Sequence, residues 1–112
     1  MIKPDEIPVY LEEQQLKQVE EIADLIGVYA IETTIDHWIA HYFNTNLQVA
    51  TIPYACFVDD DTTDRLTIYG SEILQIALNT VYSEYWTVTR CLFQNGQFSF
   101  KFIPKAEAVA ND

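Results

Sequence analysis

The sequence has few of the residues that mark several common classes of protein. Its 112 residues include only two cysteines, Cys56 and Cys91, which are far apart and form no C-x-x-C motif. A small secreted domain held by disulfides normally has more cysteines, so reduced thiols are expected. No stretch approaches the roughly eighteen apolar residues of a membrane span, and the N-terminus lacks the apolar run of a signal peptide. These absences predict a cytoplasmic protein.

Basic residues are also scarce. Six Lys and Arg stand against seventeen Asp and Glu, which gives a formal net charge of −11 and a pI near 4.3. Binding to nucleic acid usually depends on basic side chains that neutralise phosphates. Anionic membranes attract basic segments for the same reason. The composition therefore predicts neither nucleic acid nor a membrane as the partner.

Glycine and proline are few as well, with three and four residues, whereas hydrophobic residues make up 49% of the chain and aromatic residues 13%. This composition is far from that of a disordered chain and indicates a packed core. The length suits one domain. We expect a single α+β domain over residues 1–104 and a loose C-terminal tail over residues 105–112.

Three segments have the apolar spacing of amphipathic helices. The first runs over residues 12–26, where Leu16, Val19, Ile22 and Ile26 recur at helical spacing and Gly27 is placed as a C-cap. Residues 1–10, with two prolines, are predicted to be extended. The second and third helices are predicted over residues 34–43 and 72–82. In the third, the residues expected to face inward are Ile73, Ile76, Ala77 and Val81.

The remaining segments have the character of strands. Residues 47–52 form one, and residues 54–58 and 65–69 are predicted to pair across the loop Asp59–Asp64. Residues 86–93 and 97–103 flank Asn95-Gly96, the preferred dipeptide of a two-residue type I′ hairpin turn. These elements predict a two-layer α+β fold with a mainly antiparallel sheet and helices packed on one face.

The type I′ turn also predicts the register of this last hairpin. It sets Phe93 opposite Phe98, which places the phenylalanines of the second strand on the core face. The reverse face would then hold an apolar patch, with Arg90 opposite Lys101. We expect a carboxylate within salt-bridge distance of Arg90 or Lys101, and we expect Trp86 to be partly buried. The reverse face consists of Trp86, Val88, Arg90, Leu92, Lys101 and Ile103.

The charge is unevenly distributed along the chain. Residues 1–64 contain thirteen acidic and two basic residues, whereas residues 65–112 contain four of each. A concentrated acidic surface accelerates encounter with a basic one. We therefore expect a small, non-enzymatic interaction protein of inhibitor, immunity or adaptor type that presents a negative surface to a basic protein. The residues expected to bind this partner are Glu13, Glu20, Glu21, Asp24, Asp59, Asp60, Asp61, Asp64 and Trp86.

Two further points concern a second copy of the chain and the class of protein. The apolar reverse face of the C-terminal hairpin could be covered by the chain's own N-terminal segment, or it could be an interface with a partner or with a second copy of the chain in a homodimer. In size and acidity the chain is similar to bacterial immunity and inhibitor proteins as a class, a similarity of profile that carries no residues across.

The alternative function is a calcium-responsive regulator. Asp59, Asp61 and Asp64 lie in one loop and could supply the oxygen ligands that Ca²⁺ takes. The loop departs from the EF-hand pattern, because Asp64 stands where glycine is required and Gly70 where glutamate is required. Apart from this alternative, no cofactor is predicted.

The sequence gives little support for an enzyme. His37 and His41 are four residues apart on one helix, but Trp38 stands where a metalloprotease helix has its catalytic glutamate. The carboxylate pairs Glu20/Asp24 and Glu32/Asp36 look exposed. No serine or cysteine lies in a nucleophile motif, so we predict no catalytic residues.

Overall fold

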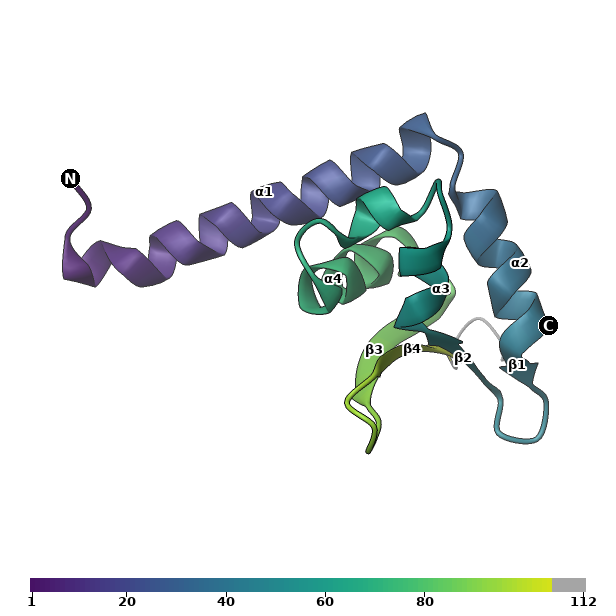
Figure 1. The fold of residues 1–112 in the computed structure, drawn as a ribbon. Coiled ribbons are helices and arrows are strands. Elements are labelled where there is room, and N and C mark those ends of the chain that lie inside the picture. The colour runs from purple at the N-terminus through teal and green to yellow at the C-terminus, as the bar shows by residue number, and fades with distance from the viewer. Residues whose placement is uncertain (106–112) are drawn as a thin grey trace.

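Four antiparallel strands form the layer on which the helices pack (Figure 1). The computed structural model describes residues 1–105, and the strands are arranged in the order β1-β2-β4-β3. This arrangement confirms the predicted α+β fold. The elements are η1 (Pro4–Glu6), α1 (Ile7–Val28), α2 (Glu32–Tyr42), β1 (Phe43–Asn44), β2 (Val49–Pro53), α3 (Tyr54–Asp59), η2 (Asp64–Thr67), α4 (Ser71–Val81), β3 (Trp86–Leu92) and β4 (Phe98–Pro104).

Helix α1 starts earlier than predicted. The segment expected to be extended forms the 3-10 turn η1 and the first turn of α1. Both prolines stand at the starts of these helical segments, where a missing backbone N–H costs no hydrogen bond. At the other end, α1 continues through Gly27 to Val28, and Ala30 adopts the left-handed conformation with φ of 53°. Pro4 thus begins η1, and Pro8 lies in the first turn of the 22-residue helix α1.

The two halves of α1 differ in their packing. Val19, Ile22 and Ile26 are buried on the body of the protein. Leu16, predicted to face inward, is 59% exposed, which corrects that prediction. Figure 1 shows the N-terminal half of α1 extending beyond the other elements, and the molecule measures 52 × 34 × 34 Å. We call residues 7–18 the overhang.

The predicted hairpin around the Asp59–Asp64 loop does not form. Its two segments are instead the short helices α3 and η2. Pro53, in extended conformation, ends β2 and is the N-cap of α3. An apolar run of five residues has no periodicity that separates a strand from a buried helical turn, and α3 buries only Phe57 completely.

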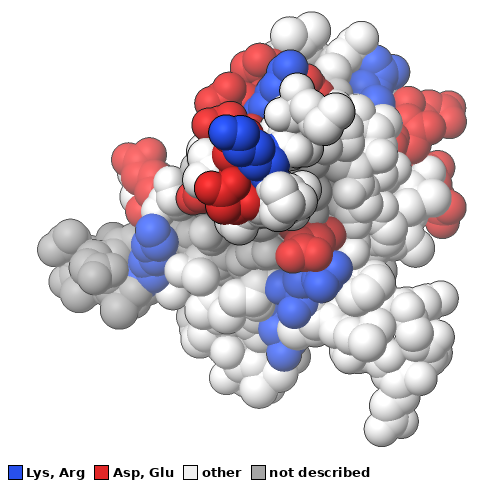
Figure 2. Space-filling model, turned by 90° about the vertical axis from the view of Figure 1, so that its left-hand side faces the viewer, with Lys and Arg blue, Asp and Glu red and all other residues white. Residues whose placement is uncertain are grey.

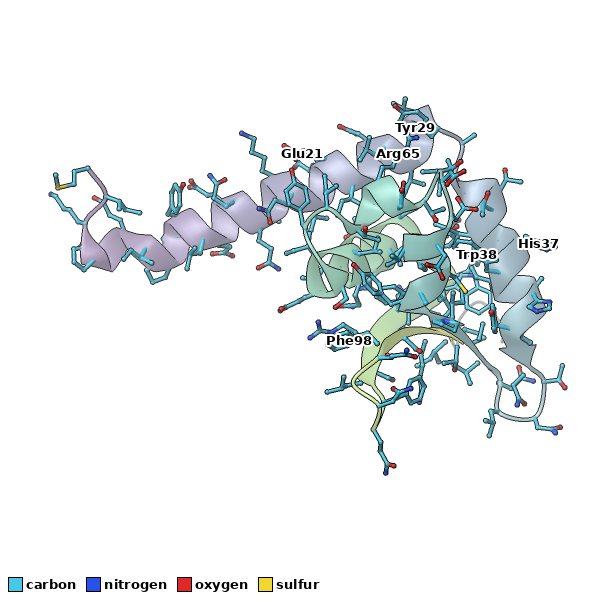
Figure 3. The ribbon with its side chains drawn as sticks, in the orientation of Figure 1. Glu21, Tyr29, His37, Trp38, Arg65 and Phe98 are labelled. Atoms are coloured by element: carbon cyan, nitrogen blue, oxygen red, sulfur yellow. The ribbon has the colours of Figure 1, made fainter. Side chains whose placement is uncertain are left out.

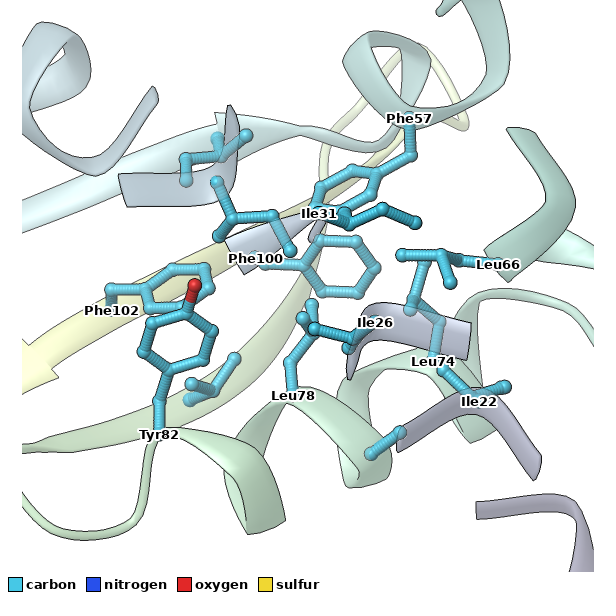
Figure 4. Close-up of a cluster of buried hydrophobic side chains, with 14 of the residues drawn as sticks. Ile22, Ile26, Ile31, Phe57, Leu66, Leu74, Leu78, Tyr82, Phe100 and Phe102 are labelled. Carbon is cyan, nitrogen blue, oxygen red and sulfur yellow. The ribbon is translucent and has the colours of Figure 1, made fainter. Parts of the chain in front are cut away.

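The core lies between the helices and one face of the sheet (Figure 4). Aromatic rings at its centre meet edge to face, with Phe57 and Phe100 centroids 5.3 Å apart and Tyr82 and Phe102 centroids 5.5 Å apart. Helix α4 buries Leu74, Ala77 and Leu78. The buried face of α4 is therefore rotated by part of a turn from the predicted face, because Ile73, Ile76 and Val81 are only half-buried.

The register of the C-terminal hairpin differs from the prediction by one residue. Phe93 N–H donates to Gln97 O, and Gly96 N–H donates to Phe93 O, both at 2.9 Å. Gly96 has φ of +81°. The loop thus has three residues and a left-handed glycine. Val88 pairs with Phe102 and Arg90 with Phe100.

This shift changes the faces of β3. Trp86, Val88, Arg90 and Leu92 share the helix-covered face with the phenylalanines of β4, so their predicted place on the reverse face is wrong. Thr89, not Arg90, lies opposite Lys101. The reverse face carries mainly small and polar side chains, and the apolar patch predicted there to support a homodimer is not formed by Trp86, Val88 and Leu92. Its residues include Thr51, Thr87, Thr89, Cys91, Ser99, Lys101 and Ile103.

Side chains of α4 cover part of the outer edge of β3. Val88 N–H donates to Asn79 Oδ1 at 2.8 Å, and Gln75 Nε2 donates to Val88 O at 2.6 Å. Beyond the end of β4, one more hydrogen bond continues its pairing with the segment before β3: Lys105 N–H donates to Tyr85 O at 2.9 Å. The predicted loose tail lies outside the described residues, except for Lys105.

Candidate partner-binding surface

Charged side chains are absent from part of the sheet and from most of the short helix next to it. Residues 43–58 and 91–100 contain no charged side chain; they form β1, β2, most of α3 and the tip of the C-terminal hairpin. Figure 2 shows Asp and Glu gathered over the upper part of one face, where the helices lie, and a largely uncharged lower part. The predicted charge asymmetry along the sequence is thus also an asymmetry in space.

The Asp59–Asp64 loop is held in one conformation by its own side chains. Asp60 Oδ1 accepts the backbone N–H of Thr62 at 2.8 Å and of Thr63 at 3.0 Å. The N–H of Thr63, followed by that of Thr62, lowers the pKa of the Asp60 carboxyl. Thr63 is fully buried, and its hydroxyl donates to Phe57 O at 2.9 Å. This geometry keeps the Asp60 carboxylate ionised and fixed against α3.

Two hollows lie side by side on α3, and Asp59 lines both. The first, of about 460 Å³, lies between α2 and α3, and Trp38 and Asp60 are among the residues that line it. The second, of about 190 Å³, lies between α3 and the C-terminal hairpin. We call them together the α3 surface; its residues are Trp38, Pro53, Tyr54, Ala55, Cys56, Val58, Asp59, Asp60, Gln97 and Phe98.

The first hollow holds a thiol close to a phenol. Cys56 Sγ lies 3.4 Å from the Tyr42 hydroxyl. This hydrogen bond, with the nearby thiol charge, raises the pKa of Tyr42. Figure 3 shows that Trp38 points from α2 towards the body, whereas its neighbour His37 points away from it. The lining of the hollow therefore combines one aromatic ring and one thiol with two carboxylates, and the histidine points away from it.

The four acidic residues predicted on α1 have different surroundings. Glu20 and Asp24 are exposed. Glu13 is exposed on the overhang, where it lines a hollow of about 490 Å³. The hydroxyl of Tyr69 donates to the carboxylate of Glu21, which raises the pKa of Tyr69. Glu21 is thus partly engaged within the protein, and the other three are free to meet a partner.

The C-terminal end of α1 is joined to η2 by an aromatic contact. The guanidinium carbon of Arg65 lies 3.8 Å from the centroid of the Tyr29 ring (Figure 3). Within residues 1–105, the buried Nε of Arg65 has no hydrogen-bond partner. Asp61 and Asp64, on either side of the buried Thr63, are exposed.

Trp86 is partly buried, as predicted, but on the helix-covered face. It lines a hollow of about 420 Å³ with Asp36, Ile39 and Phe43. The guanidinium of Arg90 does not turn to a carboxylate as we expected: its Nη1 donates to Ser71 Oγ at 2.9 Å, and its Cζ lies 4.6 Å from the centroid of the Phe98 ring. The predicted counter-charge is replaced by a hydroxyl and an aromatic face.

Sequence reasoning also missed a buried phenol. The hydroxyl of Tyr82 donates to Asp36 Oδ1 at 3.2 Å and lies 3.4 Å from Glu32 O. Burial, and next the charge of Asp36, raise the pKa of Tyr82. This contact joins the C-terminal end of α4 to the first turns of α2. Tyr82 and Asp36 are 46 residues apart in the sequence.

The described part of the chain contains no group of three or more His, Cys, Asp or Glu side chains arranged to hold a metal ion. Over the same residues, no helix combines the length and apolarity needed to cross a membrane. Comparison with known proteins gives no match to any family model, curated protein or solved structure. The assignment of function therefore depends on the surfaces themselves.

Proposed function

We propose that this protein is a non-enzymatic interaction protein, of inhibitor, immunity or adaptor type, that binds a basic protein through the α3 surface. The observation that carries this proposal is that Asp59, which is shared by the two hollows, and Asp60 line them together with Trp38, Tyr54 and Phe98. Protein interfaces typically have an aromatic centre with few charges and a polar rim. The α3 surface likewise combines aromatic side chains with few charges, and the charges that it has are acidic.

The charge of the whole molecule supports the same partner. Asp59 and Asp60 belong to residues 1–64, which carry a net charge of −11, so a basic protein would be attracted from a distance and then meet the apolar hollows. Such steering raises association rates and weakens as salt increases. Both cysteines are free, which is compatible with a reducing compartment such as the cytoplasm.

The proposal is tested by reversing one charge at the surface and one elsewhere. The protein and its Asp59→Lys and Glu84→Lys variants are used to isolate partners from the native host, and the association rate of each purified partner is measured between low and high salt. We expect a partner with a basic surface, an association rate that falls steeply with salt, and affinity reduced about tenfold or more by Asp59→Lys.

Glu84→Lys is the matched control because it makes the same charge change at an exposed residue of the neutral half of the chain. It should alter the affinity much less than Asp59→Lys. An equal loss in both variants would mean that only net charge matters and would reject the α3 surface. Partners that are acidic, or whose binding does not depend on salt, would reject the function itself.

A further inference from the structure

One flank of α1 carries apolar residues that no other residue among 1–105 covers. Val9 and Leu16 are seven residues apart and are 57% and 59% exposed. Seven residues make about two helical turns, so both lie on one side of the helix. That side borders the face that packs on the body, because the buried Val19 follows Leu16 by three residues and the half-buried Ala23 follows it by seven. Ile2, which precedes the helix by the same spacing, is 45% exposed.

A row of polar residues runs beside these apolar ones. Glu6, Tyr10, Glu13, Lys17 and Glu20 follow one another at intervals of four, three, four and three residues. This spacing places them in one row along a helix, as in the contact seam of a coiled coil. All but Glu6, the N-cap of the helix, lie within α1. The row contains Lys17, one of only two basic residues in the first 64 positions.

The row is complementary to itself when it is read in the opposite direction. If two α1 helices lie antiparallel and cross between Leu11 and Glu12, Glu6 of each copy faces Lys17 of the other. Tyr10 then faces Glu13, and Val9 lies close to Leu16. Every such contact occurs twice, which is the property of an interface with twofold symmetry.

The surface of the overhang has room for these contacts. A hollow of about 490 Å³ lies on this flank, lined by Ile2, Asp5, Glu6, Val9, Tyr10 and Glu13. In the antiparallel register, it is the position that Leu16 and Lys17 of the second copy reach. The leucine would cover Val9, and the ammonium group would meet carboxylates. Figure 2 looks onto the N-terminal end of α1, where basic and acidic side chains lie next to each other.

We propose that this protein forms a homodimer in which this flank of α1 packs antiparallel against the same flank of a second copy. The second copy fits better than an unrelated basic helix, because Lys17, between Glu13 and Glu20, interrupts the acidic residues of the row and would repel a purely basic partner. It also fits better than an anionic membrane, which the surrounding carboxylates would repel. The overhang extends beyond the other elements (Figure 1), so they leave the contact open.

A charge-exchange experiment tests this arrangement. The molecular mass of the wild-type protein is measured by light scattering and by sedimentation over a range of concentrations. One helix face per copy lies at the small end of stable interfaces, so we expect a micromolar dimer. Lys17→Glu and Glu6→Lys should each weaken dimerisation by about tenfold or more, since each removes two attractive pairs and creates repulsion. The double variant Glu6→Lys/Lys17→Glu should restore it, because the pairs are re-formed with exchanged signs.

A second experiment separates the two sides of the overhang. Leu16→Gln removes an apolar residue from the proposed contact, and Leu11→Gln removes one of equal exposure, 58%, from another side of the same helix. Leu16→Gln should weaken the dimer by about tenfold, and Leu11→Gln should leave it unchanged. Circular dichroism of each variant confirms that the domain is folded.

Several results would overturn the proposal. They are a wild-type protein that stays monomeric at high micromolar concentration, a double variant that dimerises no better than the single ones, or greater sensitivity to Leu11→Gln than to Leu16→Gln. None of these bears on the α3 surface, because Asp59 and the hollows on α3 take no part in the contact. Loss of a basic partner in the earlier experiment would in turn leave the dimer test intact.

Discussion

The two halves of α1 are one helix with the same periodicity but different uses. In the C-terminal half, Ile22 and Ile26 are 0% and 2% exposed. In the overhang, Leu11 and Leu16 are more than half exposed. Burial of apolar area is what stabilises the fold, so the C-terminal half contributes to folding and the overhang contributes little. Apolar residues that do not stabilise the domain are available for binding. Pairs of like residues, one from the body and one from the overhang, test this difference.

The largest difference is expected between Ile22→Ala and Leu11→Ala. Removing the buried isoleucine leaves a cavity among core side chains, and the free energy of unfolding should fall by about 2–5 kcal/mol. Leu11→Ala should change it by less than about 0.5 kcal/mol, because little packing is lost. Urea unfolding at micromolar concentration measures both. A cost for Leu11→Ala that approaches that of Ile22→Ala would show that the overhang is packed in solution.

A smaller difference in the free energy of unfolding is expected when a tyrosine of the body and a tyrosine of the overhang are each changed to phenylalanine. Tyr82→Phe removes a half-buried hydroxyl that binds Asp36 and should cost about 1 kcal/mol at neutral pH. The raised pKa of Tyr82 has a second consequence: its stabilising contribution is present below the ordinary tyrosine pKa of about 10 and is lost as pH rises through the raised value.

Thermal unfolding between pH 8 and 11 tests this sign. Wild type should lose more stability than Tyr82→Phe as the pH rises above about 10. Tyr10→Phe, in the overhang, should follow wild type at all pH values, since Tyr10 is 49% exposed. Parallel alkaline profiles of wild type and Tyr82→Phe would contradict the assignment.

The smallest difference is expected between two aspartates. Asp60 accepts two backbone N–H groups and its pKa is lowered, so its contribution is present above the ordinary value of about 3.9 and is lost as pH falls through the lowered one. Asp60→Asn should destabilise the protein by about 0.5 kcal/mol at pH 7, a value reduced by the solvent around the loop. Asp5→Asn, before the overhang, should have no effect.

The measurement is urea unfolding of both variants at pH 7 and at about pH 2.5, below the ordinary aspartate pKa. The difference between wild type and Asp60→Asn should shrink at the lower pH, because the contribution of the charged carboxylate decreases once the pH falls below the ordinary aspartate pKa. A difference that is the same at both pH values would mean that the carboxylate charge does not hold the loop.

Long periodic segments were predicted well from sequence, and short ones were not. The packed part of α1 and helix α4 were recognised because their apolar spacing extends over several turns. Residues 54–58 were taken for a strand because five apolar residues carry no period. Asn95-Gly96 fits both a two-residue turn and the last two positions of a three-residue loop with a left-handed glycine. This ambiguity shifted the faces of Trp86 and Arg90.

The candidate surface was predicted only in its charges. Asp59 and Asp60 were expected on a surface loop; Asp59 is instead the last residue of α3, and Asp60 begins the loop that follows it. The hollows beside them depend on Trp38 from α2 and Phe98 from β4, which are far apart in the sequence. The row on the flank of α1 was missed for another reason: a helix expected to begin at residue 12 leaves Glu6, Val9 and Tyr10 outside it.

The two amide side chains on the edge of β3 have a consequence for the fate of the protein on heating. An edge strand with free N–H and C=O groups is a template for the strand of another chain. Asn79 and Gln75 occupy these groups at Val88 for as long as α4 stays in place. Partial detachment of α4 would expose the edge together with the phenylalanines of β4. Aggregation should therefore start from a state in which α4 has come loose before the sheet has melted, and it should limit how far the protein refolds after cooling.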